Sequence, residues 1–214
     1  MIRFADDGLA FITFPQEYRL ARSLWNIFLL VAARTGRPKA AGAFSVFLTS
    51  REMPPVNPTE NRIYGTVSAN KQKEMSGLEF VQGLASRSLP LNTIARTLGY
   101  DVTEATNGRV VIVAEPNDTL LNPAGTVHGG FSATLLDSCM GLAVQSTLEK
   151  GIGQTTLEFK ISLVRPITSE TGTIKAEGAV LSRGRRIGTA EGKITDRNGR
   201  LLAHGTTTCL IFET

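Results

Sequence analysis

The chain has 214 residues, of which 42% are hydrophobic and 20% are charged, a composition typical of a globular protein rather than of a disordered or fibrous one. Its net charge of +4 lies wholly in the first third, because residues 1–74 hold ten Lys and Arg against six Asp and Glu, whereas residues 75–214 hold thirteen of each. With no basic stripe interleaved with aromatic residues, this pattern argues against a nucleic-acid-binding protein.

The two cysteines, Cys139 and Cys209, are too few and too far apart for a disulfide framework or a metal site. We therefore expect a reducing, cytoplasmic setting, no metal and no redox cofactor. The longest apolar run near the start, residues 24–33, is shorter than the roughly 20 residues that a membrane-spanning helix needs. We expect no membrane partner.

Residues 1–74 read poorly as a folded domain, because apolar clusters alternate with Arg, Pro and Gly without a steady period, and residues 51–62 hold three Pro. Two interpretations compete. This segment is either a flexible extension with a partner-docking helix around Leu20 to Ala33, or an over-called start upstream of Met75. The abrupt change in character at Met75 favours the second, so the sequence predicts an N-terminal extension over 1–74 and one domain over 75–214.

From Met75 onward the periodicity predicts regular elements in a clear order. Two short helices are expected near 79–86 and 93–100, followed by two strands around a Thr-Asn-Gly turn, and a long helix over about 130–149. The pattern then switches to a period of two and predicts four strands, over 155–164, 171–182, 187–196 and 201–212. One helix cannot cover both faces of a six-stranded sheet. We therefore expect an α+β domain in which an antiparallel sheet curls around a single helix.

The expected long helix is apolar around most of its circumference yet holds one carboxylate, Asp137. A lone carboxylate in an apolar helix costs free energy unless it has a partner or a use. His128, Gly129 and Gly130 come directly before or at the start of this helix, where unpaired N–H groups can polarise a carbonyl and stabilise an oxyanion. Asp137 lies about two turns further on, too far to reach a group held at the start of its own helix. The sequence therefore favours a dimer in which the carboxylate meets that group across the subunit boundary.

The other candidate residues allow a structural as well as a functional role. His128 and Asn122 could simply shape the loop, Thr155 could be an ordinary hydroxyl at the start of a strand, and His204 lies in a strand pattern typical of a structural residue.

Three stretches, NPAGTVHGGFSATLLDSCMG, GQTTLEFKISLVRPI and SRGRRIGTAEGKITDRNGRLLAHGTTTCLIF, resemble the hotdog-fold acyl-CoA thioesterases of the phenylacetate-degradation, 4-hydroxybenzoyl-CoA-thioesterase-like type. The resemblance covers about residues 77–212 and does not reach 1–74. It implies that a central helix is wrapped by an antiparallel sheet, and that dimers pair into tetramers with active sites at the dimer interface.

The resemblance also implies a role for each matching residue. Asn122 and His128 match a loop pair that orients the thioester, and the Gly129 N–H matches the group that polarises its carbonyl. Asp137 matches the catalytic carboxylate, supplied by the opposite subunit, and Thr155 matches a position thought to place the water. A further set matches positions that contact coenzyme A: Gly130, Gly184, Arg185 and Arg186. Arginine side chains bind phosphate groups well, but residues 184–186 would equally fit an ordinary solvent-exposed turn.

The sequence therefore predicts a thioester hydrolase that converts an acyl-CoA or aryl-CoA to the free acid and coenzyme A, with coenzyme A entering only as part of the substrate. Asp137 would act as a nucleophile or as a general base. The alternative is a hotdog module that binds acyl-CoA without turning it over. A hotdog hydratase fits less well, because no His follows Asp137 nearby.

Overall fold

The structure is a computed structural model that describes residues 2–4, 10–12 and 62–214. The first two of these ranges form a pair of short antiparallel strands, β1 (Ile2–Phe4) and β2 (Ala10–Ile12). The docking helix expected around residues 20–33 lies outside the described residues.

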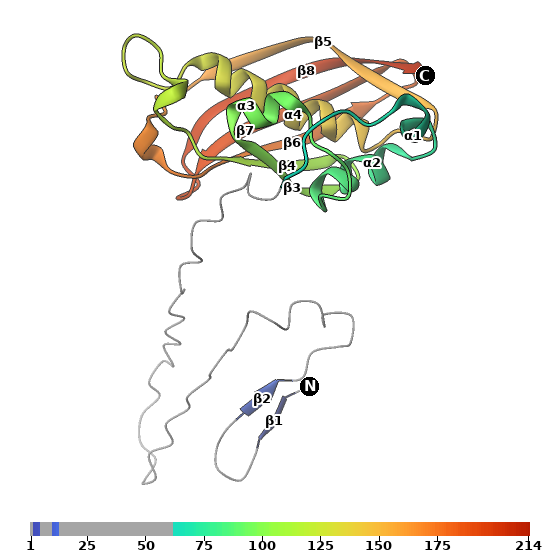
Figure 1. The fold of residues 1–214 in the computed structure, drawn as a ribbon, viewed down its shortest axis with the longest axis horizontal. Helices are drawn as coiled ribbons and strands as arrows, with labels where there is room; N and C mark the ends of the chain where they lie inside the picture. The colour runs from blue at the N-terminus through green and yellow to red at the C-terminus, as the bar shows by residue number, and fades with distance from the viewer. Residues whose placement is uncertain (1, 5–9, 13–61) are drawn as a thin grey trace. The chain divides into compact units, whose positions relative to one another are not determined.

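Residues 62–214 fold into a domain of helices and one large sheet (Figure 1). In chain order its helices and strands are α1 (Ala69–Lys73), α2 (Gly77–Ala85), α3 (Thr93–Leu98), β3 (Tyr100–Thr106), β4 (Arg109–Ala114), α4 (Gly129–Gln145), β5 (Ile152–Leu163), β6 (Ile174–Arg183), β7 (Ile187–Asp196) and β8 (Leu201–Glu213), with short 3-10 turns at Asp118–Leu120 and Ser169–Thr171. Within the described ranges, no helix is long and apolar enough to cross a membrane.

The six strands pair antiparallel in the order β3-β4-β6-β7-β8-β5, which places β5 at one edge of the sheet. The long helix α4 runs along one face of this sheet and contacts all six strands (Figure 1). The expectation of an α+β domain with an antiparallel sheet around one long helix is therefore confirmed.

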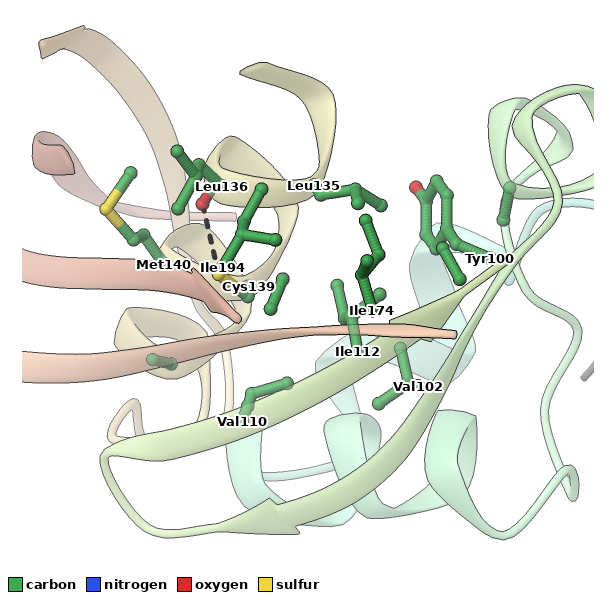
Figure 2. Packing of buried hydrophobic residues seen from close by; sticks show 14 of the residues in the cluster. Tyr100, Val102, Val110, Ile112, Leu135, Leu136, Cys139, Met140, Ile174 and Ile194 are labelled. Carbon is green, nitrogen blue, oxygen red and sulfur yellow. Dashed lines mark hydrogen bonds between the residues drawn. The ribbon is translucent and has the colours of Figure 1, made fainter. Parts of the chain in front are cut away.

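The core lies between α4 and the sheet. Figure 2 shows that Leu135, Leu136 and Met140 of α4 lie among apolar side chains of the strands, and all three are fully buried. The closest approach is at Gly178 of β6, where a Cβ atom would lie 2.3 Å from the backbone oxygen of Cys139. Only glycine fits there, so the sequence allows the helix to lie directly on the strand.

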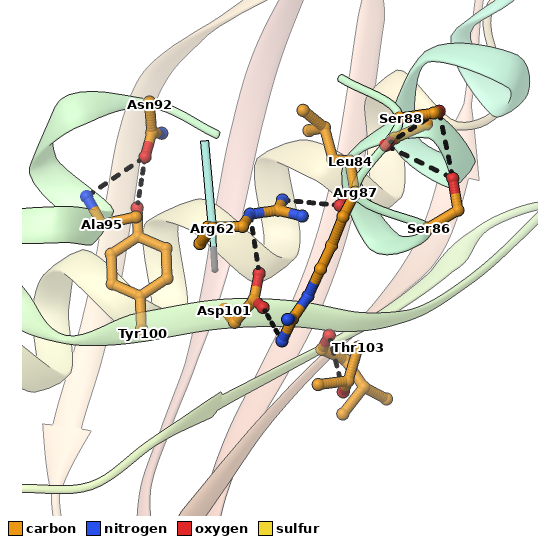
Figure 3. Close-up of polar contacts among 12 residues, drawn as sticks. Arg62, Leu84, Ser86, Arg87, Ser88, Asn92, Ala95, Tyr100, Asp101 and Thr103 are labelled. Atoms are coloured by element: carbon orange, nitrogen blue, oxygen red, sulfur yellow. Dashed lines mark hydrogen bonds and ion pairs between the residues drawn. The ribbon is translucent and has the colours of Figure 1, made fainter. Parts of the chain in front are cut away.

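The described domain begins upstream of the boundary expected at Met75. The side chain of Arg62 is wholly buried, and its Nε lies 3.2 Å from Oδ1 of Asp101 at the start of β3 (Figure 3). Arg62 also donates from Nη2 to the backbone oxygen of Leu84 at 2.5 Å, while Arg87 approaches the second oxygen of Asp101 at 3.0 Å. A charged side chain is seldom fully buried unless it is paired, so these contacts fix Arg62 as part of the domain.

The residues that follow Arg62 continue this packing. The backbone of Leu91 donates to Ile63 at 3.0 Å and accepts from Gly65 at 2.8 Å, and Val67 joins the core. We call residues 62–67 the N-terminal strap. Whether translation begins at Met75 stays a prediction, but a chain that began there would lack the strap.

Candidate active site

Helix α4 begins in a way that leaves a donor unpaired at its N-terminus. His128 is the N-cap residue, and its Nδ1 accepts a hydrogen bond from the N–H of Gly130 at 2.9 Å. The N–H of Phe131 donates to the His128 backbone oxygen, whereas the N–H of Gly129 has no protein acceptor in the described part of the chain. This N–H lies at the positive end of the helix dipole, where an oxyanion would be stabilised.

The cap also determines which hydrogen His128 can offer. Because Nδ1 acts as an acceptor toward Gly130, a neutral His128 carries its proton on Nε2. The His128 side chain is exposed, so Nε2–H is available as a second donor beside the Gly129 N–H. The sequence analysis left His128 between a capping and a thioester-orienting role, and the geometry allows both at once.

Asp137 lies on the side of α4 that is least buried. The sheet-facing side of the helix is buried, whereas the side that holds Asp137 is half-buried: Ala133, Thr134, Asp137, Ser138, Leu142 and Gln145. The periodicity predicted a helix buried nearly all round, but the structure leaves this carboxylate accessible. Asp137 is also the only carboxylate of α4.

One side chain holds the Asp137 carboxylate. The hydroxyl of Thr156, on the neighbouring edge strand β5, donates to Oδ1 of Asp137 at 2.9 Å. Two further contacts show that β5 runs antiparallel beside α4: Gln154 donates to the backbone of Gly141, and a Cβ at Gly129 would touch Leu163. The carboxylate is therefore fixed by the strand next to its helix.

Thr155, the threonine expected in the site, does not lie beside Asp137. Its side chain is exposed, and it pairs in register with Leu210 on the face of β5 opposite to Thr156. Adjacent residues of a strand point to opposite faces, so a shift of one residue exchanges the two threonines. Thr156 rather than Thr155 therefore lies beside Asp137 in this chain, and the role that the resemblance implies for Thr155 stays a prediction.

Asn122 shapes the loop that leads to His128. Its Oδ1 accepts from the backbone N–H groups of Ala124 (2.9 Å) and Thr126 (3.3 Å), and its Nδ2 donates to the Thr126 hydroxyl at 2.8 Å. Most of its hydrogen-bonding capacity is used within its own loop. The structural interpretation of Asn122 therefore has direct support, and an effect on a thioester would come through the loop.

The acid and the donor do not meet within one chain. Eight residues separate Gly129 from Asp137 on α4, which corresponds to about 12 Å along the helix axis. A single thioester carbonyl cannot contact both groups of the same helix. The described domain therefore holds an accessible carboxylate and an unpaired amide donor on one helix, but the two groups do not contact each other.

The residues expected to bind coenzyme A fall into two places. Gly184, Arg185 and Arg186 are exposed on the turn between β6 and β7, beside a cavity of about 680 Å³. Other residues complete its lining: Glu149, Ile152, Arg183, Ile211, Phe212 and Glu213. Gly130, by contrast, lies at the opposite end of α4, a helix about 25 Å long, so it cannot share one phosphate with this turn in the same chain.

The groups that surround the Asp137 stripe are held neutral. Burial raises the pKa of the Cys139 thiol to about 12, and burial also raises the pKa values of Cys209 and Tyr100. The Tyr100 hydroxyl lies 3.2 Å from the hydroxyl of Ser138, the residue that follows Asp137. The two thiols and the phenol therefore stay protonated at neutral pH, a state in which they are poor nucleophiles.

Comparisons with known proteins relate this chain to thioesterases. Residues 124–203 match the model of the thioesterase superfamily. A predicted esterase of Halobacterium salinarum is 34% identical over 99 residues, which cover 44% of this chain and 64% of that protein. Human acyl-coenzyme A thioesterase 13 is 29% identical over 113 residues, which cover 51% of this chain and 79% of that protein.

Solved structures extend the match to the fold. A crystal structure from Ralstonia eutropha, described as a thioesterase-like protein related to phenylacetic acid degradation, is 28% identical with a TM-score of 0.55. The match covers 64% of this chain and 99% of that one. The chain spans less than two thirds of the Halobacterium relative, but nearly all of the Ralstonia protein.

Proposed function

We propose that this chain, whose residues 124–203 match the thioesterase superfamily, hydrolyses the thioester bond of an acyl-CoA or aryl-CoA to give the free acid and coenzyme A. The observation that carries the proposal is the pairing of an accessible carboxylate, held at one oxygen by Thr156, with an unpaired amide at the start of the same helix. A carboxylate and a backbone N–H donor for the oxyanion are the groups that acyl transfer to water requires.

The carbonyl would be activated by the helix N-terminus. The Gly129 N–H donates to the carbonyl oxygen and stabilises the negative charge that develops there, with Nε2–H of His128 as a second donor. One preorganised donor of this kind is typically worth about 10²–10³ in rate.

Asp137 would then act in one of two ways. As a nucleophile, its oxygen bonds to the carbonyl carbon while the C–S bond breaks, coenzyme A leaves as the thiolate, and water hydrolyses the resulting anhydride. As a general base, it takes a proton from a water molecule whose oxygen bonds to the carbonyl carbon, and that proton passes to the departing thiolate. Neither route needs a metal or a redox cofactor.

A second copy of the chain would complete the site. Strand β5 is an edge strand of twelve residues whose apolar side chains remain accessible: Leu157 is 56% exposed, Phe159 41% and Leu163 55%. Long apolar edges are normally covered, and pairing with another strand covers them. Because the Asp137 stripe lies next to β5, a two-fold pairing through β5 would bring the Gly129 N–H of one copy toward the Asp137 of the other. We propose a homodimer on this basis, while assembly into a homotetramer and a cytoplasmic location stay predictions.

The cavity beside Arg185 and Arg186 would receive the phosphates of coenzyme A. It also borders Ile152, which lies four residues before Thr156 on β5 and thus about 13 Å from it. An extended pantetheine arm is of similar length, so one substrate could reach from the cavity to Asp137 along the strand.

The proposal is tested by thiol release from a panel of aromatic, short, medium and long acyl-CoAs, with the full chain and its Asp137→Asn variant measured side by side. We expect wild type to release coenzyme A and the variant, which keeps the shape of the side chain but loses its charge, to lose nearly all turnover. Circular dichroism and thermal unfolding control for folding.

Two results would count against the proposal. Retention of most activity by Asp137→Asn would remove the carboxylate from the mechanism. Tight binding of acyl-CoA without release by a folded wild-type protein would favour the alternative, a binding module.

A further inference from the structure

We infer that Glu149 sets the affinity of this chain for coenzyme A, because its carboxylate occupies an arginine that would otherwise bind a phosphate group. This role rests on the proposed function and concerns the cavity of about 680 Å³ beside the turn between β6 and β7. Both Glu149 and Arg183 line that cavity, and Nη2 of Arg183 donates to Oε2 of Glu149. The carboxylate therefore lies where a phosphate oxygen would bind.

The charges that line the cavity largely cancel. Three arginines and two glutamates are among the lining residues: Arg183, Arg185, Arg186, Glu149 and Glu213. Coenzyme A brings a diphosphate and a ribose phosphate, so this lining attracts it less strongly than three free arginines would. An arginine binds a carboxylate and a phosphate through the same planar set of N–H donors. Glu149 and a phosphate therefore compete for Arg183.

The pair between Glu149 and Arg183 is open enough to exchange partners. The side chain of Arg183 is 31% exposed and that of Glu149 is 65% exposed. Exposed ion pairs of this kind are weak, so a phosphate can displace the carboxylate. The hydrogen bond from its own backbone N–H lowers the pKa of Glu149, and Arg183 lowers it further, so the competing carboxylate is charged at neutral pH.

The two residues are held at the cavity by different elements. Arg183 is the last residue of β6 and pairs in register with Gly188 of β7, so its backbone belongs to the sheet. Glu149 follows the end of α4, and its backbone oxygen accepts from the N–H of Ile152 at the start of β5 at 3.3 Å. An exchange of partners therefore requires only that the Glu149 side chain turns away.

Such competition weakens the binding of substrate and product alike. Acyl-CoA and free coenzyme A carry the same phosphates, so the carboxylate lowers the affinity for both by the same factor and leaves the chemical step unchanged. Glu149 therefore sets KM and limits inhibition by the released coenzyme A, and it is not a catalytic residue.

The test compares Glu149→Gln with wild type, in the full chain and at low ionic strength. Calorimetry with free coenzyme A measures binding, and thiol release is resolved into kcat and KM. We expect the variant to bind coenzyme A about 3- to 10-fold more tightly, and its KM for acyl-CoA to fall by the same factor with little change in kcat. The gain should shrink in high salt, where exposed charges are screened.

Three controls separate competition for Arg183 from a general effect of charge or folding. Glu170→Gln removes the same charge from an exposed residue at the other end of β6, and it should change neither binding nor KM. In an Arg183→Gln background, Glu149→Gln should have a much smaller effect, because the arginine that it would release is missing. An acyl-pantetheine thioester has no phosphate, so its KM should be the same for wild type and Glu149→Gln.

The possible results separate this role from the proposed function. Unchanged or weaker binding of coenzyme A by a folded Glu149→Gln would overturn the role of Glu149, as would an equal fall in KM for the acyl-pantetheine thioester. Absence of coenzyme A binding in both proteins would overturn it as well. Failure of the proposed function would instead appear as binding of coenzyme A without thiol release, and the calorimetric comparison would still decide the role of Glu149.

Discussion

Replacing Asp101 by Asn should destabilise the domain more than replacing either arginine that contacts it. In the structure Asp101 has two cationic partners, whereas the buried Arg62 has Asp101 as its ion-pair partner and the Leu84 carbonyl as a neutral acceptor (Figure 3). Asp101→Asn therefore leaves a guanidinium that is 0% exposed without a counter-charge. Removing one partner of a buried pair typically costs about 3–5 kcal/mol, and we expect a loss in this range.

The two arginine variants should follow in a fixed order. Arg62→Met leaves Asp101 paired with Arg87, so it should cost less, about 1–3 kcal/mol. Arg87 is 39% exposed and can return to solvent, so Arg87→Met is the matched control and should cost at most about 1 kcal/mol. Burial raises the pKa of Asp101 and lowers the pKa of Arg62. Both directions mean that burial disfavours the charged form of each group, so the charged form of each is stabilised by its partner.

Urea unfolding of the full chain at pH 7, followed by the circular dichroism of the sheet, measures the three free energies of unfolding. The double variant Arg62→Met with Asp101→Leu should regain much of the loss, because no unpaired charge remains in the core. The reasoning would be refuted if Arg62→Met were more damaging than Asp101→Asn, or if Arg87→Met cost as much as either. A negligible effect of all three would show that the strap does not belong to the cooperative fold.

Two further predictions concern the edge and the outer face of the sheet. Phe159→Glu places a charge in the exposed apolar row of β5 and should convert the proposed dimer to a monomer with little activity, as measured by light scattering and thiol release; an active monomer would contradict the cross-subunit site. Glu177 has its pKa lowered to about 2, chiefly by the hydrogen bond from Arg109, so its contribution to stability is complete above about pH 4.3 and is lost as the pH falls toward 2. Glu177→Gln should therefore be about 1–3 kcal/mol less stable than wild type at pH 7, with the gap closing between pH 5 and pH 2 in urea unfolding; a gap independent of pH would rule out this ion pair as its source.

The sequence predicted those parts of the fold in which a residue type allows few backbone conformations. The apolar run after His128 and the Gly-Gly pair predicted α4 and its N-terminus to within one residue, and Asn-Gly at 198–199 predicted the turn between the last two strands. These features depend on local chemistry that a single sequence contains. The arrangement of the sheet around one helix was predicted because a single helix cannot cover both faces of a six-stranded sheet.

The sequence did not predict features that depend on how distant segments of the chain pair with one another. Counting back by two from Phe159 and Ile161, which share one face of β5, leads to Thr155, whereas the extra residue Leu157 places Thr156 on that face. The Arg62–Asp101 pair joins residues 39 positions apart, and nothing in the composition of residues 51–62 indicated a buried arginine. Both features become visible only when distant strands and segments are in place.

The strand order has a consequence for how the site forms as the chain folds. Strand β5 leaves α4 directly but pairs in the sheet only with β8, which follows it by about forty residues. Contacts between such distant segments form slowly, and during synthesis β5 must wait for the last strand of the domain to emerge. The hydroxyl that holds Asp137 therefore reaches its place among the final steps of folding, so in a partly made or partly folded chain the orientation of this carboxylate would not yet be fixed.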